Sequence, residues 1–242
     1  MKKSLRDKKI IIVGAGFGGV RCVLDLAKQR PPKTKIIFIS DKPHFEYHPF
    51  LYRAVTGHSP LEVCIPLEEI YKKKGIEVLE DFITEFDLKE KTLKGRSGSR
   101  YSFDFLVLAM GSETAYFNIP GLKELSFGFK TIGEALRLKK HFHELFTFYE
   151  KAELQEKVKA AHIVVVGGGA SGVELAGELA VYVRKMLKNH NLDSSLATID
   201  IIEAAPRLLP ALSKNVSKKV ESRLRELGVN IFLNRMVVKE EV

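Results

Sequence analysis

Short runs of uninterrupted apolar residues, each leading into a cluster of glycines, are the main feature of the hydrophobic pattern. Residues 10–13 precede the glycine-rich segment 14–19, and residues 162–166 precede the glycine-rich segment 167–172. A run of β-branched residues without polar alternation is typical of a strand buried on both faces of a parallel sheet. Both copies therefore predict a buried strand that ends in a glycine turn.

A helix and a second buried strand are predicted after each glycine cluster. Apolar residues recur at steps of three and four over residues 20–27 and 173–187, which is the spacing of a buried helical face. Residues 35–39 and 197–202 are again mostly apolar and read as strands. The chain thus contains a strand–turn–helix–strand unit twice.

The segment between the two copies predicts a β-hairpin and another buried strand. We expect one strand over residues 75–86 that enters a hairpin with returns at 92–93 and 101–102, separated by a turn rich in glycine and serine. Residues 105–111 read as a buried strand that ends at glycine, and 133–159 as a long charged helix. The fold class is therefore α/β, with two Rossmann-like units that contain parallel sheets and a hairpin insertion between them.

After the second copy, the pattern predicts three more elements. Residues 216–227 form a helical pattern closed by Gly228, and residues 229–233 follow as a strand. The last residues before Val242 read as the start of a further strand.

Composition is that of a folded chain with a basic surface. The 242 residues are 45% hydrophobic and 29% charged, which excludes wholesale disorder. No apolar stretch reaches the roughly 18 residues of a membrane span. The net charge of +9 favours phosphate ligands, anionic lipid or nucleic acid. No recognition motif accompanies the charge, so we expect no nucleic-acid partner.

Cysteines and histidines do not point to a metal or a dithiol. Cys22 and Cys64 form no C-x-x-C pair, and each is interpreted as a small core residue. His44, His48 and His58 lie close together, but their spacing fits no metal motif. We therefore expect no bound metal.

Both glycine clusters match G-x-G-x-x-G, through Gly14, Gly16 and Gly19 and through Gly167, Gly169 and Gly172. In such a motif the first glycine permits a tight turn, the second lets the backbone approach a pyrophosphate, and the third lets the helix pack on the strand. The pyrophosphate binds to free N–H groups at the helix N-terminus. The alternative is that the glycines only form tight turns. The strand before, the helix after and an acid beyond the next strand favour two dinucleotide sites.

Asp41 and Glu203 are the acids that follow the second strand of each unit. A carboxylate at that place accepts hydrogen bonds from the ribose hydroxyls of an adenosine. Because a carboxylate repels a 2′-phosphate, Glu203 predicts NADH rather than NADPH. Arg207 lies close to Glu203 in the sequence and is the one residue there that would suit a 2′-phosphate.

Two dinucleotide units in this order, with a hairpin between them, resemble the flavoproteins that bind FAD in the first unit and NAD(P)H in the second. More closely, the chain resembles type II NADH dehydrogenases, the single-chain NADH:quinone oxidoreductases. The segments that carry this resemblance are residues 39–57, 103–114, 164–179 and 202–210. Met110 departs from the family pattern, which usually has threonine there.

The resemblance implies FAD and NADH as cofactors and assigns residues to each. The implied FAD-binding residues are Gly14, Gly16, Phe17, Gly18, Gly19, Asp41, His48, Ile83, Ala109 and Gly111. The implied NADH-binding residues are Gly167, Gly169, Ser171, Gly172 and Glu203. Glu174 matches a family glutamate near the nicotinamide and the flavin, and is the candidate catalytic residue. The alternative is an acid in the first helical turn with no catalytic role.

By the same resemblance we expect residues 1–120 to be the first segment of an FAD-binding unit, 121–160 a helical connection, and 161–242 an incomplete NADH-binding unit. The implied activity is hydride transfer from NADH to FAD and then electron transfer to a quinone-type acceptor. The family's later G-D segment and its membrane- and quinone-binding part have no counterpart in this sequence. We therefore expect a fragment or a shortened relative, and the alternative function is that of a non-catalytic dinucleotide-binding fragment. The expected location is the cytoplasm or the inner face of the cell membrane, with peripheral contact through the absent part and with a homodimer left open.

Overall fold

The computed structural model describes residues 7–29, 32–149, 153 and 161–241. It divides the chain into two units, unit 1 with Met1–Tyr47 and Val63–Glu113 and unit 2 with His48–Glu62 and Thr114–Val242. The chain therefore passes from unit 1 to unit 2 after Tyr47, returns to unit 1 at Val63, and enters unit 2 again at Thr114. Each unit contains one of the two glycine turns.

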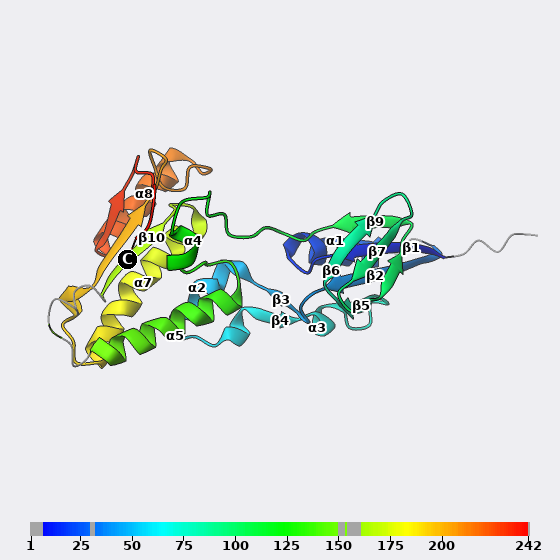
Figure 1. Ribbon diagram of the computed structural model, residues 1–242, viewed down its shortest axis with the longest axis horizontal. Helices are drawn as coiled ribbons and strands as arrows, with labels where there is room; N and C mark the ends of the chain where they lie inside the picture. Colours follow the sequence, from blue (N-terminus) through cyan, green and yellow to red (C-terminus); the bar gives the residue numbers. More distant parts are fainter. Residues whose placement is uncertain (1–6, 30–31, 150–152, 154–160, 242) are drawn as a thin grey trace, which may run out of the picture. The chain divides into compact units, whose positions relative to one another are not determined.

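A four-stranded parallel sheet forms the centre of unit 1 (Figure 1). In spatial order its strands are β5 (Glu77–Glu80), β2 (Thr34–Ser40), β1 (Lys8–Val13) and β9 (Phe105–Leu108), and α1 (Phe17–Gln29) connects β1 to β2. The strands predicted from the apolar runs at 10–13, 35–39 and 105–111 are confirmed, the last of them ending at Leu108. The helix predicted after the first glycine cluster is confirmed as α1.

Both faces of this sheet are covered around its centre. Ile12 and Phe38 pack on one side with residues of α1, β3 (His44–Glu46) and α3 (Leu67–Tyr71). Ile11 and Ile37 pack on the other side with Leu93 of β7 (Thr92–Gly95). Successive side chains of a strand point to opposite faces, so residues on a doubly covered strand are buried in either orientation. This burial explains why the two central strands show no polar alternation.

Short antiparallel strands complete unit 1. β6 (Ile83–Asp87), β7 and β8 (Arg100–Ser102) form a three-stranded sheet, and β3 pairs with β4 (Cys64–Pro66). The prediction of one strand over residues 75–86 is wrong, because β5 and β6 belong to different sheets. The backbone leaves the parallel sheet at Asp81, whose N–H donates to the carbonyl of Ser40 (2.8 Å).

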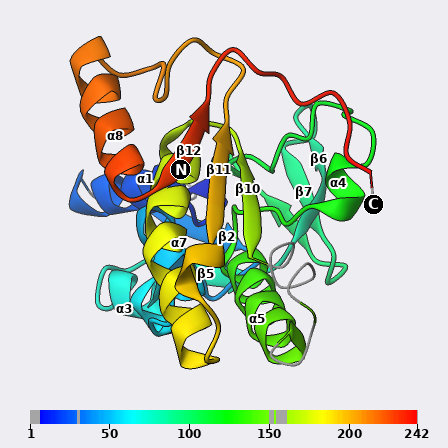
Figure 2. The same cartoon turned by 90° about the vertical axis from the view of Figure 1, so that its left-hand side faces the viewer.

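Unit 2 contains a three-stranded parallel sheet in the order β10 (His162–Val166), β11 (Thr198–Ile202) and β12 (Val229–Phe232), and Figure 2 shows these strands side by side. α7 (Ala170–Asn189) and η3 (Ser194–Leu196) connect β10 to β11, and α8 (Lys214–Glu226) connects β11 to β12. The predicted strands and helices of the second copy are thus confirmed. The prediction that β10 is buried on both faces is wrong. Val164 and Val166 are 47% and 48% exposed, because none of the described segments covers that face of β10.

Residues 48–62 and the segment after Thr114 complete unit 2. They form η1 (His48–Phe50), α2 (Leu51–Val55), η2 (Pro60–Glu62), α4 (Leu122–Leu125) and α5 (Ile132–Tyr149). α2 packs against α5 and α7, and the Thr56 hydroxyl donates to the Glu178 carboxylate of α7 (3.3 Å). The sequence pattern did not predict this packing, because α2 has a single turn and a weak helical signal.

The helix before β10 and the segment after β12 differ from the sequence predictions. The helix predicted over residues 133–159 is present as α5 up to Tyr149, and most of the remainder lies outside the described residues. The further strand predicted before Val242 is wrong for residues 234–241, which form no strand. There the Glu240 N–H donates to the carbonyl of Pro120 (2.9 Å), so the chain packs against the start of α4.

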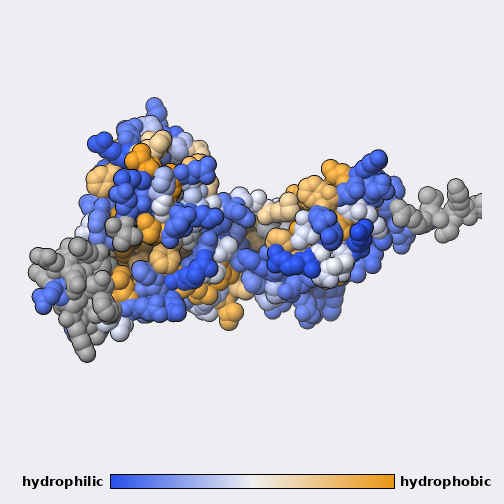
Figure 3. Space-filling view, viewed as in Figure 1, coloured by the Kyte–Doolittle hydropathy of each residue, from blue (hydrophilic) through white to orange (hydrophobic). Residues whose placement is uncertain are grey.

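No helix in the described part of the chain is long and apolar enough to cross a membrane. Hydrophilic residues cover much of the face seen in Figure 3, with hydrophobic residues in scattered patches.

Candidate dinucleotide-binding sites

The first glycine turn joins β1 to α1. Gly14 has a φ of +103°, and its N–H donates to the carbonyl of Ile39 in β2 (2.9 Å). A Cβ at Gly14 would lie 2.3 Å from the carbonyl oxygen of Ala109, so a side chain does not fit between the turn and the end of β9. A Cβ at Gly19 would lie 1.9 Å from the Gly14 carbonyl oxygen, because α1 packs directly on the turn. These glycines are required by the fold.

Gly16 is required for another reason. A Cβ at Gly16 would meet no atom within 4 Å, so the space beside this residue is open. α1 begins at the next residue, Phe17, and the N–H groups of its first turn have no partner within the helix. An anionic group can approach such N–H groups closely when no Cβ intervenes. The first turn therefore fits a pyrophosphate.

The second glycine turn repeats this geometry between β10 and α7. Gly167 has a φ of +107°, and its N–H donates to the carbonyl of Ile202 in β11 (2.8 Å). A Cβ at Gly172 would lie 2.0 Å from the Gly167 carbonyl oxygen, whereas a Cβ at Gly169 would meet nothing within 4 Å. Gly169 is the N-cap of α7, and no side chain caps this helix end. The second turn therefore has the same open geometry at an uncapped helix end, which fits a phosphate group.

The Glu203 carboxylate is held at the second turn. Its Oε2 accepts a hydrogen bond from the Gly168 N–H and its Oε1 accepts one from the Ala205 N–H, both at 2.6 Å. A Cβ at Gly168 would lie 3.0 Å from Oε2 and 2.5 Å from Leu208 Cδ2, which explains the third consecutive glycine of this turn. A carboxylate oxygen has more than one lone pair, so both oxygens can still accept from ribose hydroxyls.

A protein-family model for pyridine nucleotide-disulphide oxidoreductases matches residues 8–241, which contain both glycine turns. The chain belongs to this family.

Curated relatives share 27–30% identity with the chain. They include a type II NADH:quinone oxidoreductase of Staphylococcus haemolyticus, 28% identical over 233 residues, and the enzyme Ndh of Mycobacterium tuberculosis, 30% identical over 240 residues. Each alignment covers 96% of this chain, but 58% and 51% of those relatives. The chain therefore spans about half the length of the curated relatives that it matches.

Solved structures with the same fold include two that match nearly the whole chain. The structure of NDH2 from Plasmodium falciparum in complex with NADH matches with a TM-score of 0.87 and 28% identity, over 98% of this chain and 50% of that one. The sulfide:quinone oxidoreductase of Aquifex aeolicus matches with a TM-score of 0.75 at 24% identity, which shows the fold alone. The predicted α/β fold with two dinucleotide-type units is confirmed by these matches.

The guanidinium of Arg207 binds the loop after β11 and α8, not the second glycine turn. Nη1 donates to the carbonyl of Leu212 and to the Ser217 hydroxyl (both 2.8 Å), and Nη2 donates to the carbonyl of Pro210. These bonds join the loop after β11 to α8. Arg207 thus holds this loop to α8 through its Nη groups.

Asp41 lies directly after β2 and is exposed. The preceding residue, Ser40, is 3% exposed, and its hydroxyl oxygen accepts a hydrogen bond from the Lys42 N–H (3.1 Å). Both residues lie at the edge of the sheet that the first glycine turn also occupies, because Gly14 bonds to Ile39.

Other residues implied for FAD border the same turn in unit 1. Ala109 follows β9, its N–H donates to the carbonyl of Val13 (2.8 Å), and its Cβ would lie 4.0 Å from a Cβ at Gly18. Gly111, two residues later, has a φ of +77°. Phe17 is 49% exposed, and its ring meets that of Phe45 edge-on at 4.9 Å. The structure therefore brings the end of β9 and the first turn together.

The remaining predicted residues are dispersed. Ile83 begins β6 in unit 1, His48 begins η1 in unit 2, and Ser171 lies exposed in the first turn of α7. The placement of Glu174 in the first helical turn is wrong: α7 begins at Ala170, so Glu174 is in the second turn, where the helix dipole acts more weakly. Glu174 is exposed as a whole, while partial burial raises the pKa of its carboxyl group.

Asp81 is a structural carboxylate that sequence reasoning missed. It accepts hydrogen bonds from the hydroxyls of Ser97 (2.6 Å) and Tyr101 (2.7 Å) and from the Phe82 N–H (2.8 Å). The Ser97 and Tyr101 hydroxyls lower the pKa of Asp81 to about 2. Asp81 thereby fastens the β7–β8 turn to the end of β5. An acid at a strand end, followed by a serine-rich turn, was the available signal.

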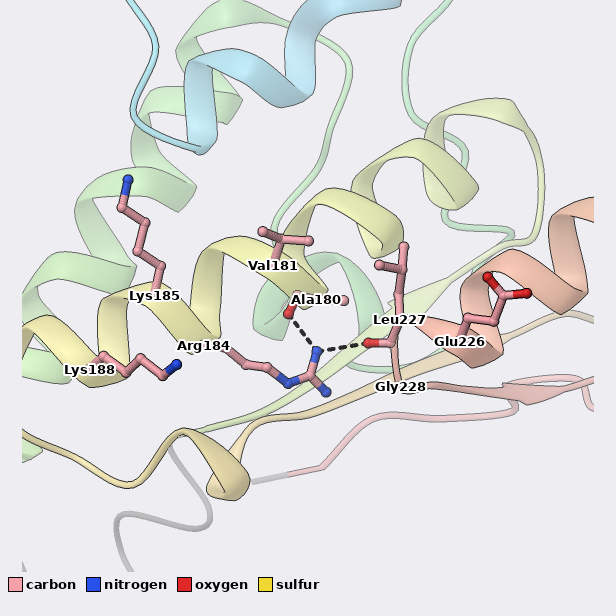
Figure 4. A pocket seen from close by; sticks show the side chains of 8 residues that line it. All are labelled: Ala180, Val181, Arg184, Lys185, Lys188, Glu226, Leu227 and Gly228. Atoms are coloured by element: carbon pink, nitrogen blue, oxygen red, sulfur yellow. Dashed lines mark hydrogen bonds between the residues drawn. The ribbon is translucent and has the colours of Figure 1, made fainter.

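A pocket in unit 2 lies outside both turns (Figure 4). It is lined by Ala180, Val181, Arg184, Lys185, Lys188, Glu226, Leu227 and Gly228. Arg184 Nη1 donates to the carbonyls of Ala180 (2.6 Å) and Leu227 (2.8 Å), so this guanidinium joins α7 to the end of α8. The pocket therefore lies where α7 packs against the end of α8.

Cys22 and Cys64 are free and half-buried, and burial raises the pKa of both thiols. Within the described ranges, no three histidine, cysteine or acidic residues are grouped so that they could hold a metal ion.

Proposed function

We propose that the first glycine turn holds FAD, that the second holds NADH, and that the whole protein transfers hydride from NADH to FAD and then electrons to a quinone-type acceptor. The observation that carries this proposal is the pair of matching turns, in each of which two glycines are required by the fold and the middle one leaves open space. The family match and the resemblance to type II NADH:quinone oxidoreductases support it.

The residues of unit 1 fit FAD on this geometry. N–H groups of α1 beside Gly16 would bind the pyrophosphate, and the segment Ala109 to Gly111 would border the flavin. The backbone at Ile83 would contact the adenine. His48, which belongs to unit 2, is assigned to an FAD phosphate by the resemblance alone. Phe17 and Gly18 belong to the same turn. Residues 1–120 would thus be the first segment of an FAD-binding unit.

The residues of unit 2 fit NADH. Gly167, Gly169, Ser171 and Gly172 would surround the pyrophosphate at the uncapped end of α7, and Glu203 would accept hydrogen bonds from the adenosine ribose. Residues 161–242 would form this NADH-binding unit, after a helical connection over residues 121–160.

NADH is proposed over NADPH because of the charges at the second turn. The Glu203 carboxylate, fixed by two backbone N–H groups, repels a 2′-phosphate. The Nη1 group of Arg207 already donates to the Leu212 carbonyl and to the Ser217 hydroxyl. We therefore do not assign this guanidinium to a 2′-phosphate.

The flavin, when bound, supplies the redox chemistry by which hydride and electrons are passed on. This chain positions both dinucleotides, and Glu174 is its proposed catalytic side chain. Partial burial raises the pKa of the Glu174 carboxyl group.

We also propose that the whole protein acts at the inner face of the cell membrane, because a quinone-type acceptor is the substrate named for its relatives. Peripheral membrane contact would come from a part outside this sequence. A homodimer is proposed through the outer strand β9, where Phe105 is 54% and Leu108 43% exposed.

Titration with FAD and with NADH tests the function. The chain should bind FAD and turn yellow, and NADH added without oxygen should bleach the flavin absorbance. Gly16→Val should remove FAD binding and keep NADH binding, and Gly169→Val should do the reverse, because each added side chain fills one open space. Gly133→Val in α5 is the matched control and should bind both ligands. Loss of both ligands in either turn variant would contradict two separate sites.

The second candidate function is dinucleotide binding without turnover. The chain covers about half the length of the relatives that it matches, so this candidate is kept beside the first. A colourless chain that binds NADH with ordinary affinity would support it over the first.

A further inference from the structure

The pocket between α7 and the end of α8 combines positive charge with apolar surface (Figure 4). Its cations are Arg184, Lys185 and Lys188 of α7, and its apolar surface comes from Ala180, Val181 and Leu227. The pocket has a volume of about 600 Å³, which suits a small organic molecule. At a rise of 1.5 Å per residue, Arg184 lies about 20 Å along α7 from the second glycine turn. The pocket is therefore separate from the proposed NADH site.

Arg184 is held so that one edge of its guanidinium stays open. Nη1 donates to the carbonyls of Ala180 (2.6 Å) and Leu227 (2.8 Å), which uses both of its hydrogens. Nε and Nη2 make no hydrogen bond to the described residues, and neither atom is buried. These two nitrogens form the edge of a guanidinium that binds a phosphate or a carboxylate through two parallel hydrogen bonds. The backbone thus fixes Arg184 with this edge accessible.

Two lysines add positive charge that no acid in the described part of the chain neutralises. Lys188 lies one helical turn after Arg184, on the same face of α7, and its ammonium group points toward the guanidinium in Figure 4. Lys185 also lines the pocket, and like charges at such helical spacings repel each other. Glu226, the one acid among the lining residues of this pocket, pairs with Arg223 of α8 (3.2 Å). The three cations therefore lack a counter-ion within the described residues.

We propose that this pocket binds a phosphate group that is attached to an apolar part. The Nε–Nη2 edge of Arg184 binds two phosphate oxygens, and Lys188 neutralises the second negative charge of the phosphate. The apolar part rests on Val181, which is 56% exposed. A carboxylate carries a single charge and leaves more of the positive charge unpaired, so the charge favours a phosphate. A soluble phosphate monoester and a lipid headgroup both supply this chemistry.

Calorimetric titration with phenyl phosphate tests the proposal. Lys188→Gln should weaken binding about two- to fivefold, the effect of losing one exposed ion pair. Arg184→Lys keeps the charge but removes the paired N–H groups, so it should weaken binding about tenfold or more. Arg184 also joins two helices, so the melting temperature of Arg184→Lys should fall. Lys188→Gln is therefore the deciding variant, and unchanged binding by it would overturn the proposal.

Lys218→Gln in α8 is the matched control, because Lys218 is exposed, lies outside the pocket and loses the same charge. It should bind phenyl phosphate as the unaltered chain does. Equal weakening by Lys218→Gln and Lys188→Gln would show attraction by overall charge alone and contradict a defined site. Gly16→Val and Gly169→Val should also keep phenyl phosphate binding. Loss of binding in either turn variant would place the phosphate at a glycine turn and overturn the proposal.

The apolar part of the ligand has its own test. Inorganic phosphate should bind more weakly than phenyl phosphate, because it covers none of the apolar surface at Val181. Val181→Ser should reduce this difference. Equal affinity of the unaltered chain for the two ligands would refute the proposed ligand class.

Sedimentation with vesicles distinguishes the two sources of the phosphate. Binding to phosphatidic acid but not to phosphatidylcholine, weakened by Lys188→Gln and not by Lys218→Gln, would assign the pocket to a lipid headgroup. Binding of phenyl phosphate without binding to either vesicle would assign it to a soluble monoester. Absence of binding to phenyl phosphate and to phosphatidic acid would overturn the proposal. These assays need neither FAD nor NADH, so their outcome is independent of the proposed function.

Discussion

Gly169 and Gly172 lie in the same turn but should respond in opposite ways to an added methyl group. A Cβ at Gly172 would lie 2.0 Å from the Gly167 carbonyl oxygen, whereas ordinary contacts begin at 3.4 Å. Helix α7 or the turn must therefore move by roughly 1.4 Å, and both clashing atoms are fixed to the backbone. Overpacking of this kind costs about 1–3 kcal/mol, and alanine in a helix regains at most about 1 kcal/mol.

Gly172→Ala should therefore destabilise the protein by about 2 kcal/mol, seen as a melting temperature lower by several degrees. Gly169→Ala should change stability by less than about 1 kcal/mol, because the φ of −73° suits any residue and the space is open. Its added methyl group instead occupies the approach of the pyrophosphate, so NADH should bind at least tenfold more weakly. Thermal unfolding and NADH titration of each variant measure the two effects.

Gly177→Ala is the control within the same helix. Its Cβ would lie 3.4 Å from Leu224 Cδ2, the movable end of a side chain, so stability and NADH affinity should both be retained. The reasoning is refuted if Gly172→Ala melts at the temperature of the unaltered protein, or if Gly169→Ala binds NADH normally.

Further predictions concern four charged residues. The pKa of Asp81 is lowered to about 2, so its contribution to stability is present above the ordinary aspartate pKa of 3.8 and is lost as the pH falls towards 2. The free energy of unfolding of Asp81→Asn should therefore change less with pH in that window than that of the unaltered protein. Arg207→Met should lower the melting temperature and leave the ratio of NADH to NADPH affinity unchanged, because Nη1 and Nη2 bind the loop; a changed ratio would place Arg207 at the ribose. With the intact protein, kcat/KM should be larger with NADH than with NADPH, and Glu203→Ala should narrow that difference. Glu174→Gln should slow quinone reduction more than it weakens NADH binding, and an unchanged kcat would remove its catalytic role.

The strands and the glycine turns were predictable because their causes are local. An uninterrupted β-branched run such as residues 10–13 suits a buried parallel strand, and the spacing of glycines follows from a tight turn that meets a helix. Glu203 could be found for the same reason, since it directly follows a strand. The signal of residues 75–86 was misread because a continuous extended segment does not show where it changes sheets.

The sequence by itself determined that two dinucleotide-type turns exist, where they lie, and which glycines they use, because backbone conformation and the strand–helix pattern depend on neighbouring residues. Only the tertiary structure decided which side chains lie at those turns. The hydrogen bond from the Gly168 N–H fixes Glu203 at the second turn. Packing binds the Nη groups of Arg207 to a loop and Asp81 to a hairpin. These choices depend on hydrogen bonds between residues far apart in the chain or on distances that a linear pattern does not contain, so no local reading of residue types could have made them.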